Sequence, residues 1–479
     1  MATSSGRMDG RSLSVLFVLC GAIFLEGIDV AMLNVALPAI RTDLGLSTGA
    51  LSGLVSAYVL GYGGFMLLGG RAADLLGRRR MFLTWLVVFL VFSGLGGVAT
   101  EGWMLLTARF VTGVAAAFLA PAGLALVTAA FPDGPLRTRA LGIYAGIAAG
   151  GYTLGLVAGG LLVTIGWRWV FFAPVILAAV LLLAALVLVK DDEEQRAPRT
   201  GRFDLAGALS ITGAMLLLAY AVVRLEHGTA GLATTVLVGA GGLLLLGVFV
   251  AVERRAADPL VRLEILRNAA LARTNLTALL FIGAFAGFQF LVTLYLQEIR
   301  GWSPLETGLA MLVVGLDTVL APTLTPWLVG RFGNTRVLFA GLATAALSYL
   351  LFLPVAPDWT YAAMLPSFVL VGMAFALAYG PLTMASTAEV DEREHGLAGG
   401  LLYTAIQFGT ALGISGVTAV SVVAGGAGRI TLDGIRTALL LPIAAVLVAA
   451  LVTAFSLRRR VSTPPNAPDA PEPQAVASA

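Results

Sequence analysis

Three acidic side chains lie well inside long apolar segments of the chain: Glu26, Asp29 and Asp317. An ionised carboxylate in hydrocarbon costs about 2.5–3.5 kcal/mol on insertion scales, so such a residue must face a cavity or a partner. Glu26 and Asp29 are three residues apart and therefore share one face of a helix. Two carboxyl groups placed so close together disfavour double ionisation. The pair is therefore a candidate for taking up and releasing a proton; the alternative is that an acid only joins two helices.

Arg109 is the one basic residue well inside an apolar segment. If successive segments cross a layer in alternate directions, the segments that carry Asp29 and Arg109 bring both residues to a similar depth. We expect the two side chains to interact, directly or through water. Protonation of Asp29 would then weaken its hold on Arg109, which makes the pair a switch. The alternative is a static buried ion pair.

Several aromatic and amide side chains in the apolar segments are candidates for lining a cavity. An aromatic surface with a few polar groups suits flat lipophilic cations. For each residue taken singly, ordinary helix packing is the alternative. The candidates are Asn34, Tyr58, Tyr152, Gln289, Tyr379 and Gln407.

The composition is that of a polytopic membrane protein. Of the 479 residues, 58% are hydrophobic and 12% are charged, and the mean hydropathy is +0.93; an ordinary soluble domain is about 25% charged. The net charge of +3 predicts no basic groove, so no nucleic-acid partner is expected. The single cysteine, Cys20, cannot form an internal disulfide. The only histidines, His227 and His395, fall in separate loops, so no metal site is expected.

Fourteen apolar segments are long enough to cross a bilayer, since a helical span needs about 20 apolar residues. They lie at 13–40, 48–69, 81–100, 103–131, 138–164, 168–189, 205–223, 231–252, 272–297, 305–330, 337–356, 360–388, 397–424 and 435–457. We expect the first to be a retained helix rather than a signal peptide, because it runs on to Ile40 and contains two acids.

The distribution of basic residues favours an even number of spans with both ends of the chain in the cytoplasm. Of the 30 Lys and Arg residues, six fall in outer loops and Arg109 lies within a span, which leaves 23 on the cytoplasmic side. Short loops rich in Lys and Arg stay cytoplasmic. The six outer residues are Arg41, Arg168, Arg224, Arg300, Arg429 and Arg436.

An internal repeat divides the chain into two related parts. Gly45 and Gly301 precede corresponding segments, Gly77 and Gly333 follow them, and both pairs are 256 residues apart. Weak internal symmetry of this kind is typical of transporters whose substrate site lies between two halves. We therefore expect four parts, namely a six-helix bundle at 1–190, a linker with two inserted helices at 191–267, a second six-helix bundle at 268–460 and a disordered cytoplasmic tail at 461–479.

The basic turn at 70–80, with the sequence GRAADLLGRRR, separates the second and third apolar segments. Its arrangement of Gly70, Asp74, Gly77 and Arg78 resembles the signature between helices two and three of the major facilitator superfamily. The resemblance implies that Asp74 docks against the other half of the protein in the outward-facing state, while Arg78 helps to fix the loop. We call these four residues the gating loop.

Other stretches resemble one branch of that superfamily, the fourteen-helix drug:proton antiporters. The stretch 27–38 is similar to the first-helix motif of that family, and 167–172 (WRWVFF) is similar to another signature, although Pro174 replaces the usual asparagine. Further matches lie at 203–207, 253–260, 295–297, 301–304 and 399–409. The matching pieces are spread over almost the whole chain, sparing the tail and the outer loops.

The resemblance implies an all-α membrane protein of the major facilitator fold, with 14 transmembrane helices arranged as six, two and six. It also implies a proton-coupled antiporter that exports lipophilic, cationic drugs or antibiotics across the cell membrane by alternating access. The expected partners are a small-molecule drug, protons and the lipid bilayer; no cofactor is implied. We expect a monomer.

The resemblance also suggests roles for particular residues. Arg109 lies in a stretch similar to the fourth-helix motif, whose arginine is implied in proton transfer. An acid in the position of Asp317 suggests that cationic, including divalent, drugs are accepted. Gly151, Gly155 and Gly159 form a stripe similar to the antiporter motif of helix five, except that Leu156 replaces a proline. Small residues let helices approach closely, and we expect this stripe to pack against the opposite half.

Two other classes of function remain as alternatives. The first is uptake or facilitated transport of a small metabolite by the same fold. The second is a membrane-embedded enzyme or sensor, which the sequence disfavours because it contains no nucleophile–base set, metal-ligand spacing or phosphate-binding loop. We therefore predict a transporter and not an enzyme.

Overall fold

The structure is a computed structural model that describes residues 9–131, 135–189, 204–224, 231–256, 265, 267–388, 390, 395–425 and 430–461. Within those ranges every regular element is a helix. The polar first part of the predicted linker, up to residue 203, and the tail from residue 462 onward lie outside the described residues.

The first eight helices follow the predicted apolar segments closely. They are α1 (Gly10–Leu44), α2 (Thr48–Leu76), α3 (Arg78–Gly97), α4 (Gly102–Ala130), α5 (Pro135–Ile165), α6 (Trp169–Leu188), α7 (Leu205–Arg224) and α8 (Leu232–Glu253).

The remaining helices begin at residue 269. They are α9 (Ala269–Leu294), α10 (Pro304–Met311), α11 (Asp317–Phe332), α12 (Asn334–Phe352), α13 (Tyr361–Thr387), α14 (His395–Gly425) and α15 (Leu432–Val461). A π-helical turn, η4 (Tyr295–Ile299), continues α9, and a 3₁₀ stretch, η5 (Leu312–Leu316), joins α10 to α11.

The segment at 305–330 is not the single regular helix that the sequence predicts. It is divided by η5, so that Asp317 is the first residue of α11 instead of lying in mid-helix. At the break the Thr318 hydroxyl donates to the carbonyl oxygen of Gly315 at 2.8 Å. Gly315 also lies against α5, where a Cβ atom in its place would be 2.8 Å from Cβ of Thr153. This close approach, together with side-chain competition for a backbone carbonyl, favours the tighter 3₁₀ turn.

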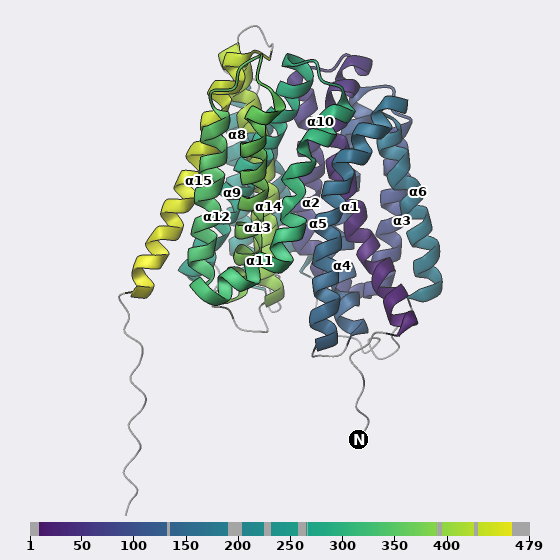
Figure 1. Cartoon of the computed structure of the whole chain (residues 1–479). Coiled ribbons are helices and arrows are strands. Elements are labelled where there is room, and N and C mark those ends of the chain that lie inside the picture. Colours follow the sequence, from purple (N-terminus) through teal and green to yellow (C-terminus); the bar gives the residue numbers. More distant parts are fainter. Residues whose placement is uncertain are drawn as a thin grey trace, which may run out of the picture.

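The helices gather into two groups that lie side by side (Figure 1). We call α1–α6 the N-bundle and α9–α15 the C-bundle. The two groups meet mainly where α2 packs on α14 and where α5 packs on α10, η5 and α11. The extra pair α7 and α8 is anchored through α7, which packs against both α2 and α14. The helix α7 therefore covers the seam between the bundles at α2 and α14.

The start of α1 and the end of α15 lie at the same end of the molecule, at the bottom of Figure 1. We call this the near end and the opposite one the far end. The turns of the predicted repeat have matching geometry. At the far end Gly45 and Gly301 have φ values of 63° and 67°, and at the near end Gly77 and Gly333 have φ values of 98° and 86°. Such positive φ values are easily adopted only by glycine, which explains why glycine occupies all four positions.

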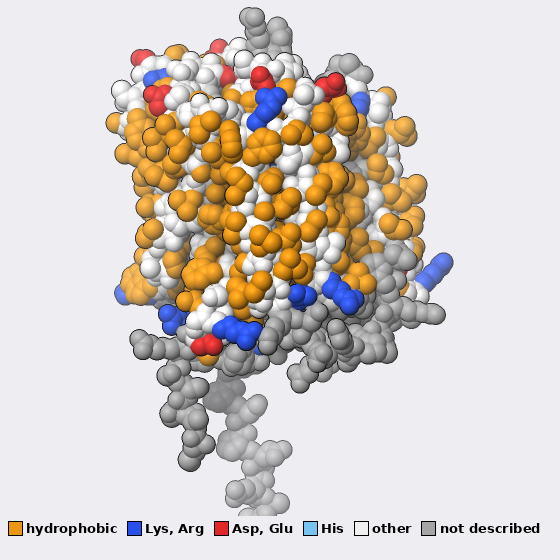
Figure 2. Space-filling model, turned by 90° about the vertical axis from the view of Figure 1, so that its right-hand side faces the viewer, with side chains coloured by type: hydrophobic (Ala, Val, Ile, Leu, Met, Phe, Trp, Pro, Cys, Tyr) orange, Lys and Arg blue, Asp and Glu red, His pale blue; other side chains and the backbone are white. Residues whose placement is uncertain are grey.

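Eleven helices of the described part of the chain are long and apolar enough to cross a membrane. Figure 2 shows a wide band of hydrophobic side chains around the middle of the visible face, with charged side chains collected at the two ends. Many of the large hydrophobic side chains are exposed, among them Leu183, Val187 and Leu244. An apolar band of this kind suits a surface in contact with lipid.

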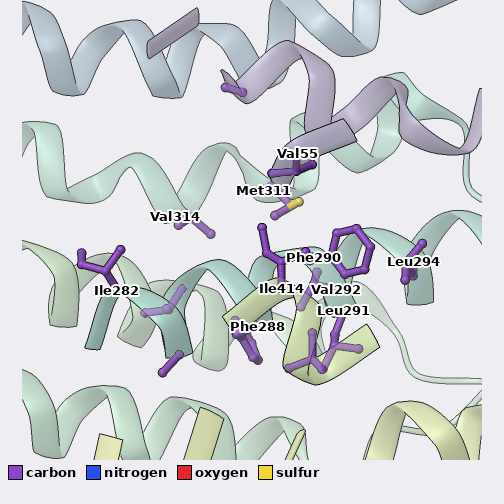
Figure 3. Close-up of a cluster of buried hydrophobic side chains, with 14 of the residues drawn as sticks. Val55, Ile282, Phe288, Phe290, Leu291, Val292, Leu294, Met311, Val314 and Ile414 are labelled. Carbon is purple, nitrogen blue, oxygen red and sulfur yellow. The ribbon is translucent and has the colours of Figure 1, made fainter. Parts of the chain in front are cut away.

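The largest buried apolar cluster joins the two bundles at the far end. Figure 3 shows Val55 of α2 beside Met311 of α10, with Phe290 of α9 and Ile414 of α14 close by. The cluster also contains the second half of α1, from Ala31 to Ile40. The core of the molecule therefore holds the two bundles together on the far side of the mid-plane.

The glycine stripe of α5 does not face the opposite bundle, which corrects the prediction. A Cβ atom at Gly151, Gly155 or Gly159 would lie 2.7–2.8 Å from an atom of α1, within the same bundle. The contact with the C-bundle is made instead by Gly160, where a Cβ atom would lie 2.8 Å from the carbonyl oxygen of Pro304. Small residues predict that helices approach closely, but the rotation of α5 decides which neighbour they meet.

Candidate functional site

A buried ion pair lies inside the N-bundle, between α1 and α4. Nη1 of Arg109 donates to Oδ2 of Asp29 at 2.5 Å, and both side chains are 2% exposed. This is the contact predicted from their depths. The guanidinium group also lies over the ring of Tyr58 from α2, 4.4 Å from its centroid. Three helices thus hold one positive and one negative charge in an almost dry environment.

Two polar groups beside this pair have no hydrogen-bond partner among the described residues. They are Nε of Arg109 and the hydroxyl of Tyr58. A buried donor without a partner costs about 1–3 kcal/mol, so such groups are uncommon in native proteins. The site therefore retains free hydrogen-bonding capacity next to its charges.

Glu26 lies one turn before Asp29 on α1 and is only partly buried. Its carboxylate accepts a hydrogen bond from the hydroxyl of Tyr62 on α2 at 3.2 Å. The rings of Tyr62 and Tyr58 meet edge to face, with their centroids 6.0 Å apart. The two carboxylates are close enough to interact electrostatically. The predicted pairing of Glu26 and Asp29 on one helical face is therefore present, with Glu26 the more accessible of the two.

Two tyrosines of the C-bundle lie in the same region as Glu26. Tyr403 of α14 packs against the cluster that contains Tyr58 and Tyr62, and its hydroxyl interacts with that of Tyr379 on α13. Tyr403 and Tyr379 are both within electrostatic range of Glu26. Glu26 therefore accepts a hydrogen bond within the N-bundle and lies within electrostatic range of two hydroxyl groups of the C-bundle.

The ring of Tyr379 is also part of an aromatic surface on the C-bundle. It stacks on Phe375 with the ring centroids 5.1 Å apart and the planes 12° from parallel. Phe375 in turn contacts Phe285 of α9 at 4.6 Å between centroids. This stack offers flat apolar faces close to the acid.

A second polar group joins three helices nearer the far end. The hydroxyl of Tyr152 on α5 donates to Oε1 of Gln289 on α9 at 2.7 Å, and it also interacts with the side chain of Asn34 on α1. Three of the predicted cavity residues thus meet one another. The hydrogen bond from Tyr152 to Gln289 crosses between the bundles.

Asp317 lies on the side of this second group. It is partly buried and within electrostatic range of Tyr152. Among the described residues no salt bridge neutralises it, and no hydrogen bond or charge interaction joins it to Glu26 or Asp29. The three acids predicted from the sequence therefore lie at two separate sites. Glu26 and Asp29 are on α1, and Asp317 is at the start of α11.

The remaining candidates have structural surroundings of their own. Gln407 of α14 packs against Gly63 of α2, where a Cβ atom would lie 3.1 Å from the Cβ of Gln407. In the gating loop, Nη1 of Arg78 donates to the carbonyl oxygen of Ala125 on α4 at 3.2 Å. Gly70 and Asp74 lie in the last turns of α2, and the side chain of Asp74 is outside the described part of the structure.

Two contacts between the bundles at the far end were not predicted. Nη1 of Arg41, near the end of α1, donates to both carboxylate oxygens of Glu298 at 2.7 and 2.8 Å. Next to it, Nε2 of Gln297 donates to the carbonyl oxygen of Val35 at 3.0 Å. Both C-bundle residues belong to the π-helical turn η4, and such turns are frequent at functional sites. The sequence shows Arg41 and Glu298 only as loop charges, so their pairing could not be predicted from it.

Most of the sequence matches a known family and named relatives. The sequence model of the Major Facilitator Superfamily matches residues 19–414. The puromycin resistance protein pur8 of Streptomyces alboniger is 35% identical over 421 residues, which cover 86% of this chain and 82% of the relative. The cephamycin export protein CmcT of Amycolatopsis lactamdurans is 36% identical over 428 residues, covering 86% of each chain.

Solved structures support the same fold. A mutant form of the nucleoside transporter NupG has a TM-score of 0.68 at 13% identity, and the match covers 93% of this chain and 99% of the transporter. A bacterial homologue of the human lysosomal transporter Spinster, in an inward-facing conformation, has a TM-score of 0.67 at 17% identity and covers 96% and 100%. The chain therefore belongs to the Major Facilitator Superfamily, and it is a multi-pass membrane transporter and not an enzyme.

Proposed function

We propose that this protein is a proton-coupled antiporter that exports lipophilic, cationic drugs or antibiotics across the cytoplasmic membrane by alternating access. The observation that carries the proposal is the buried Asp29–Arg109 pair beside the partly buried acid Glu26. The named activities of the relatives support the substrate class, since they include resistance to puromycin, export of cephamycin and resistance to lincomycin.

The proton switch follows from the electrostatics of the buried pair. In a medium of low dielectric constant, two opposite charges at 2.5 Å attract strongly, and removing one of them leaves the other uncompensated. A proton on Asp29 therefore releases the guanidinium group of Arg109. The hydroxyl of Tyr58, which has no hydrogen-bond partner among the described residues, gives the released guanidinium group an alternative partner nearby.

Glu26 is the group that a cationic substrate and a proton would share. It is more accessible than Asp29, it accepts a hydrogen bond from Tyr62, and it lies within electrostatic range of Tyr403 of the other bundle. A carboxylate can hold a cation or a proton but has little tendency to hold both. Binding of one therefore favours loss of the other, which is the requirement for exchange.

The contacts between the bundles suggest how access alternates. Those described gather from the middle of the molecule to the far end, where Arg41 meets Glu298 and Gly160 meets Pro304. We propose that this conformation is closed at the far end and open toward the near end. Opening the far end requires the Arg41–Glu298 pair to separate. In that second conformation Asp74 docks against the C-bundle and acts in gating, without touching the substrate.

We further propose that the near end is cytoplasmic and that the membrane is the cell membrane. The acids Glu101, Glu298 and Asp433 lie in far-end segments, whereas Arg78, Arg79 and Arg80 lie at the near end, as expected if short basic loops stay inside. Both termini are then cytoplasmic.

The number of spans in this proposal is fourteen. Eleven helices qualify directly by length and composition, and the shorter apolar helices Gly53–Met66, Gly150–Ile165 and Ala206–Leu218 bring the count to fourteen. The proposed parts are the six-helix bundle 1–190, the inserted pair within 191–267, the six-helix bundle 268–460 and the tail 461–479. We propose that the unit of transport is a monomer.

Asp317 is proposed as a second anionic point for cationic, including divalent, drugs. It is partly buried and carries no ion pair among the described residues, so its charge is available to a ligand.

Uptake or facilitated transport of a small metabolite is the alternative function for the whole protein. The two directions of transport can be separated by a simple accumulation measurement.

The experiment expresses the protein in a host that lacks its own drug exporters and follows the accumulation of ethidium by fluorescence. Export predicts less accumulation than in cells with an empty vector, and a rise to the vector level when a protonophore collapses the proton gradient. The variant D29N should accumulate ethidium like the vector control. Accumulation above the vector level, abolished by the protonophore, would instead establish uptake.

A further inference from the structure

Gln289 presents a buried hydrogen-bond donor that no part of the proposed proton switch uses. The residue lies on α9 and is 4% exposed. Its Oε1 atom accepts from Tyr152, whereas its Nε2 atom has no hydrogen-bond partner among the described residues. An amide nitrogen carries two donors, and leaving both unused in a buried place is unfavourable unless something else binds there.

The orientation of this amide is fixed by its neighbours. The hydroxyl of Tyr152 interacts with two amide side chains, those of Asn34 and Gln289. If Asn34 donates to the oxygen of Tyr152, the hydroxyl hydrogen of Tyr152 is free to donate to Oε1 of Gln289. The hydrogen bonds then run in one direction, from Asn34 through Tyr152 to Gln289. Nε2 of Gln289 is then left as the open end of this series of hydrogen bonds. Tyr152 is thus a positioning residue that points the donor of Gln289 away from itself.

The open donor lies in the same neighbourhood as an unneutralised acid. Asp317 is within electrostatic range of the hydroxyl that holds Gln289, and the α5 helix that carries this hydroxyl meets the Asp317 segment where Gly315 packs on Thr153. The carboxylate of Asp317 and the amide nitrogen of Gln289 bind different chemical groups of a ligand. The carboxylate takes a positive charge, and the amide nitrogen takes a neutral hydrogen-bond acceptor such as a carbonyl oxygen.

We propose that Nε2 of Gln289 is a specificity-determining donor that selects, among cationic substrates, those that carry a carbonyl or similar acceptor near the positive nitrogen. The inference rests on the proposed export of cations. A permanent cation without an acceptor gains nothing from this donor and leaves it unpaired when bound. An amino amide satisfies both Asp317 and Gln289 and is therefore favoured.

The test uses purified full-length protein in lipid nanodiscs and three probes. The diethylaminoethyl amide of benzoic acid carries a cation and an acceptor; diethyl(phenylbutyl)amine has a similar length and the same charge without the acceptor; tetraphenylphosphonium is a permanent cation. Binding is measured by calorimetry. Wild-type protein should bind the amide about tenfold more tightly than the amine, which corresponds to about 1.4 kcal/mol. The variant Q289L should bind both with the affinity that the wild type shows for the amine.

Two further variants separate specificity from damage to the fold. T293V removes a buried hydroxyl one turn along α9 and should keep the tenfold preference. Y152F leaves the donor in place but removes the group that orients it, so the preference should fall while tetraphenylphosphonium binding stays unchanged. Equal weakening of all three probes in Q289L would overturn the inference, as would a wild-type protein that binds amide and amine equally. Failure of the wild type to bind any cation would instead contradict the proposed function.

Discussion

Arg109 and Asp29 are 80 residues apart in the chain, and their side chains meet at 2.5 Å where both are almost completely buried. The pair joins α4 to α1 under the ring of Tyr58, one turn from Glu26. Burying two charges is unfavourable unless the geometry is good and the rest of their hydrogen-bonding capacity is used. Here Nε of Arg109 has no partner among the described residues, so the arrangement is better suited to changing state than to stability.

The first prediction separates a switch from a static ion pair. D29N leaves the charge of Arg109 uncompensated, which costs about 3–5 kcal/mol, so the melting temperature should fall and export should stop. Combining D29N with R109Q removes both charges and should recover most of the lost stability. Export should nevertheless remain absent, because the Asp29–Arg109 switch is lost although Glu26 is still present. A double variant that regains proton-driven export would show that the pair is only structural.

The second prediction concerns the far-end pair of Arg41 and Glu298. These side chains are 27% and 21% exposed, and we expect the ion pair to contribute about 1 kcal/mol to the far-end-closed conformation. E298Q should therefore increase the population of the far-end-open conformation about fivefold. The measurement is the distance between spin labels on the far-end turns of the two bundles.

A matched control and a rescue are available for this pair. Arg168 and Asp43 form another far-end salt bridge, but both belong to the N-bundle, so D43N should leave the distance distribution unchanged. Exchanging the charges in the double variant of R41E with E298R should restore the closed population. If D43N has the same effect as E298Q, the pair has no specific part in closing the far end.

The third prediction tests the packing of α5 on α1. A Cβ atom at Gly155 would lie 2.7 Å from the side chain of Ala31 and 2.9 Å from the backbone of Ile28. G155A should therefore destabilise the protein by about 1–3 kcal/mol through overpacking. Gly146, on the same helix, has nothing within 4 Å of such an atom, so G146A should leave the melting temperature unchanged or slightly raised. Equal effects of the two substitutions would contradict the contact.

The fourth prediction concerns the charge of Asp317. D317N keeps the size of the side chain and removes the negative charge, so a dication should lose more binding energy than a monocation. Drug resistance should fall back toward that of the exporter-free host for a dication such as chlorhexidine, with a smaller change for ethidium. A similar loss for both drugs would indicate that Asp317 acts on the transport cycle and not on the charge of the substrate.

The sequence allowed the buried ion pair to be predicted because alternating spans fix the depth of each residue. Depth alone places Asp29 and Arg109 together, and the structure has them in contact. Tyr62 was missed although a signal was present, since it follows Tyr58 by one helical turn and shares its face. Its hydrogen bond to Glu26 follows from the packing of α2 on α1.

Other features depend on how the helices are rotated and which bundle they meet, and a pattern of residue types does not fix this. The glycine stripe of α5 predicted a close approach correctly, but its neighbour is α1 and not the C-bundle. The 3₁₀ break before Asp317 lies where Gly315 packs on Thr153, and these two residues are 162 positions apart in the chain. The approach of Tyr403 to Glu26 depends on how the two bundles pack against each other. This packing cannot be predicted from the sequence of any single segment.

The most direct test of the central claim is proton movement driven by substrate in a reconstituted system. Purified protein in sealed proteoliposomes, with a pH-sensitive dye inside and no initial pH gradient, is exposed to an outward gradient of a transported drug. Antiport through Glu26 and Asp29 predicts that the lumen becomes more acidic as the drug leaves, and that neither E26Q nor D29N shows this change. Drug efflux with no change in luminal pH, or with alkalinisation, would contradict the account.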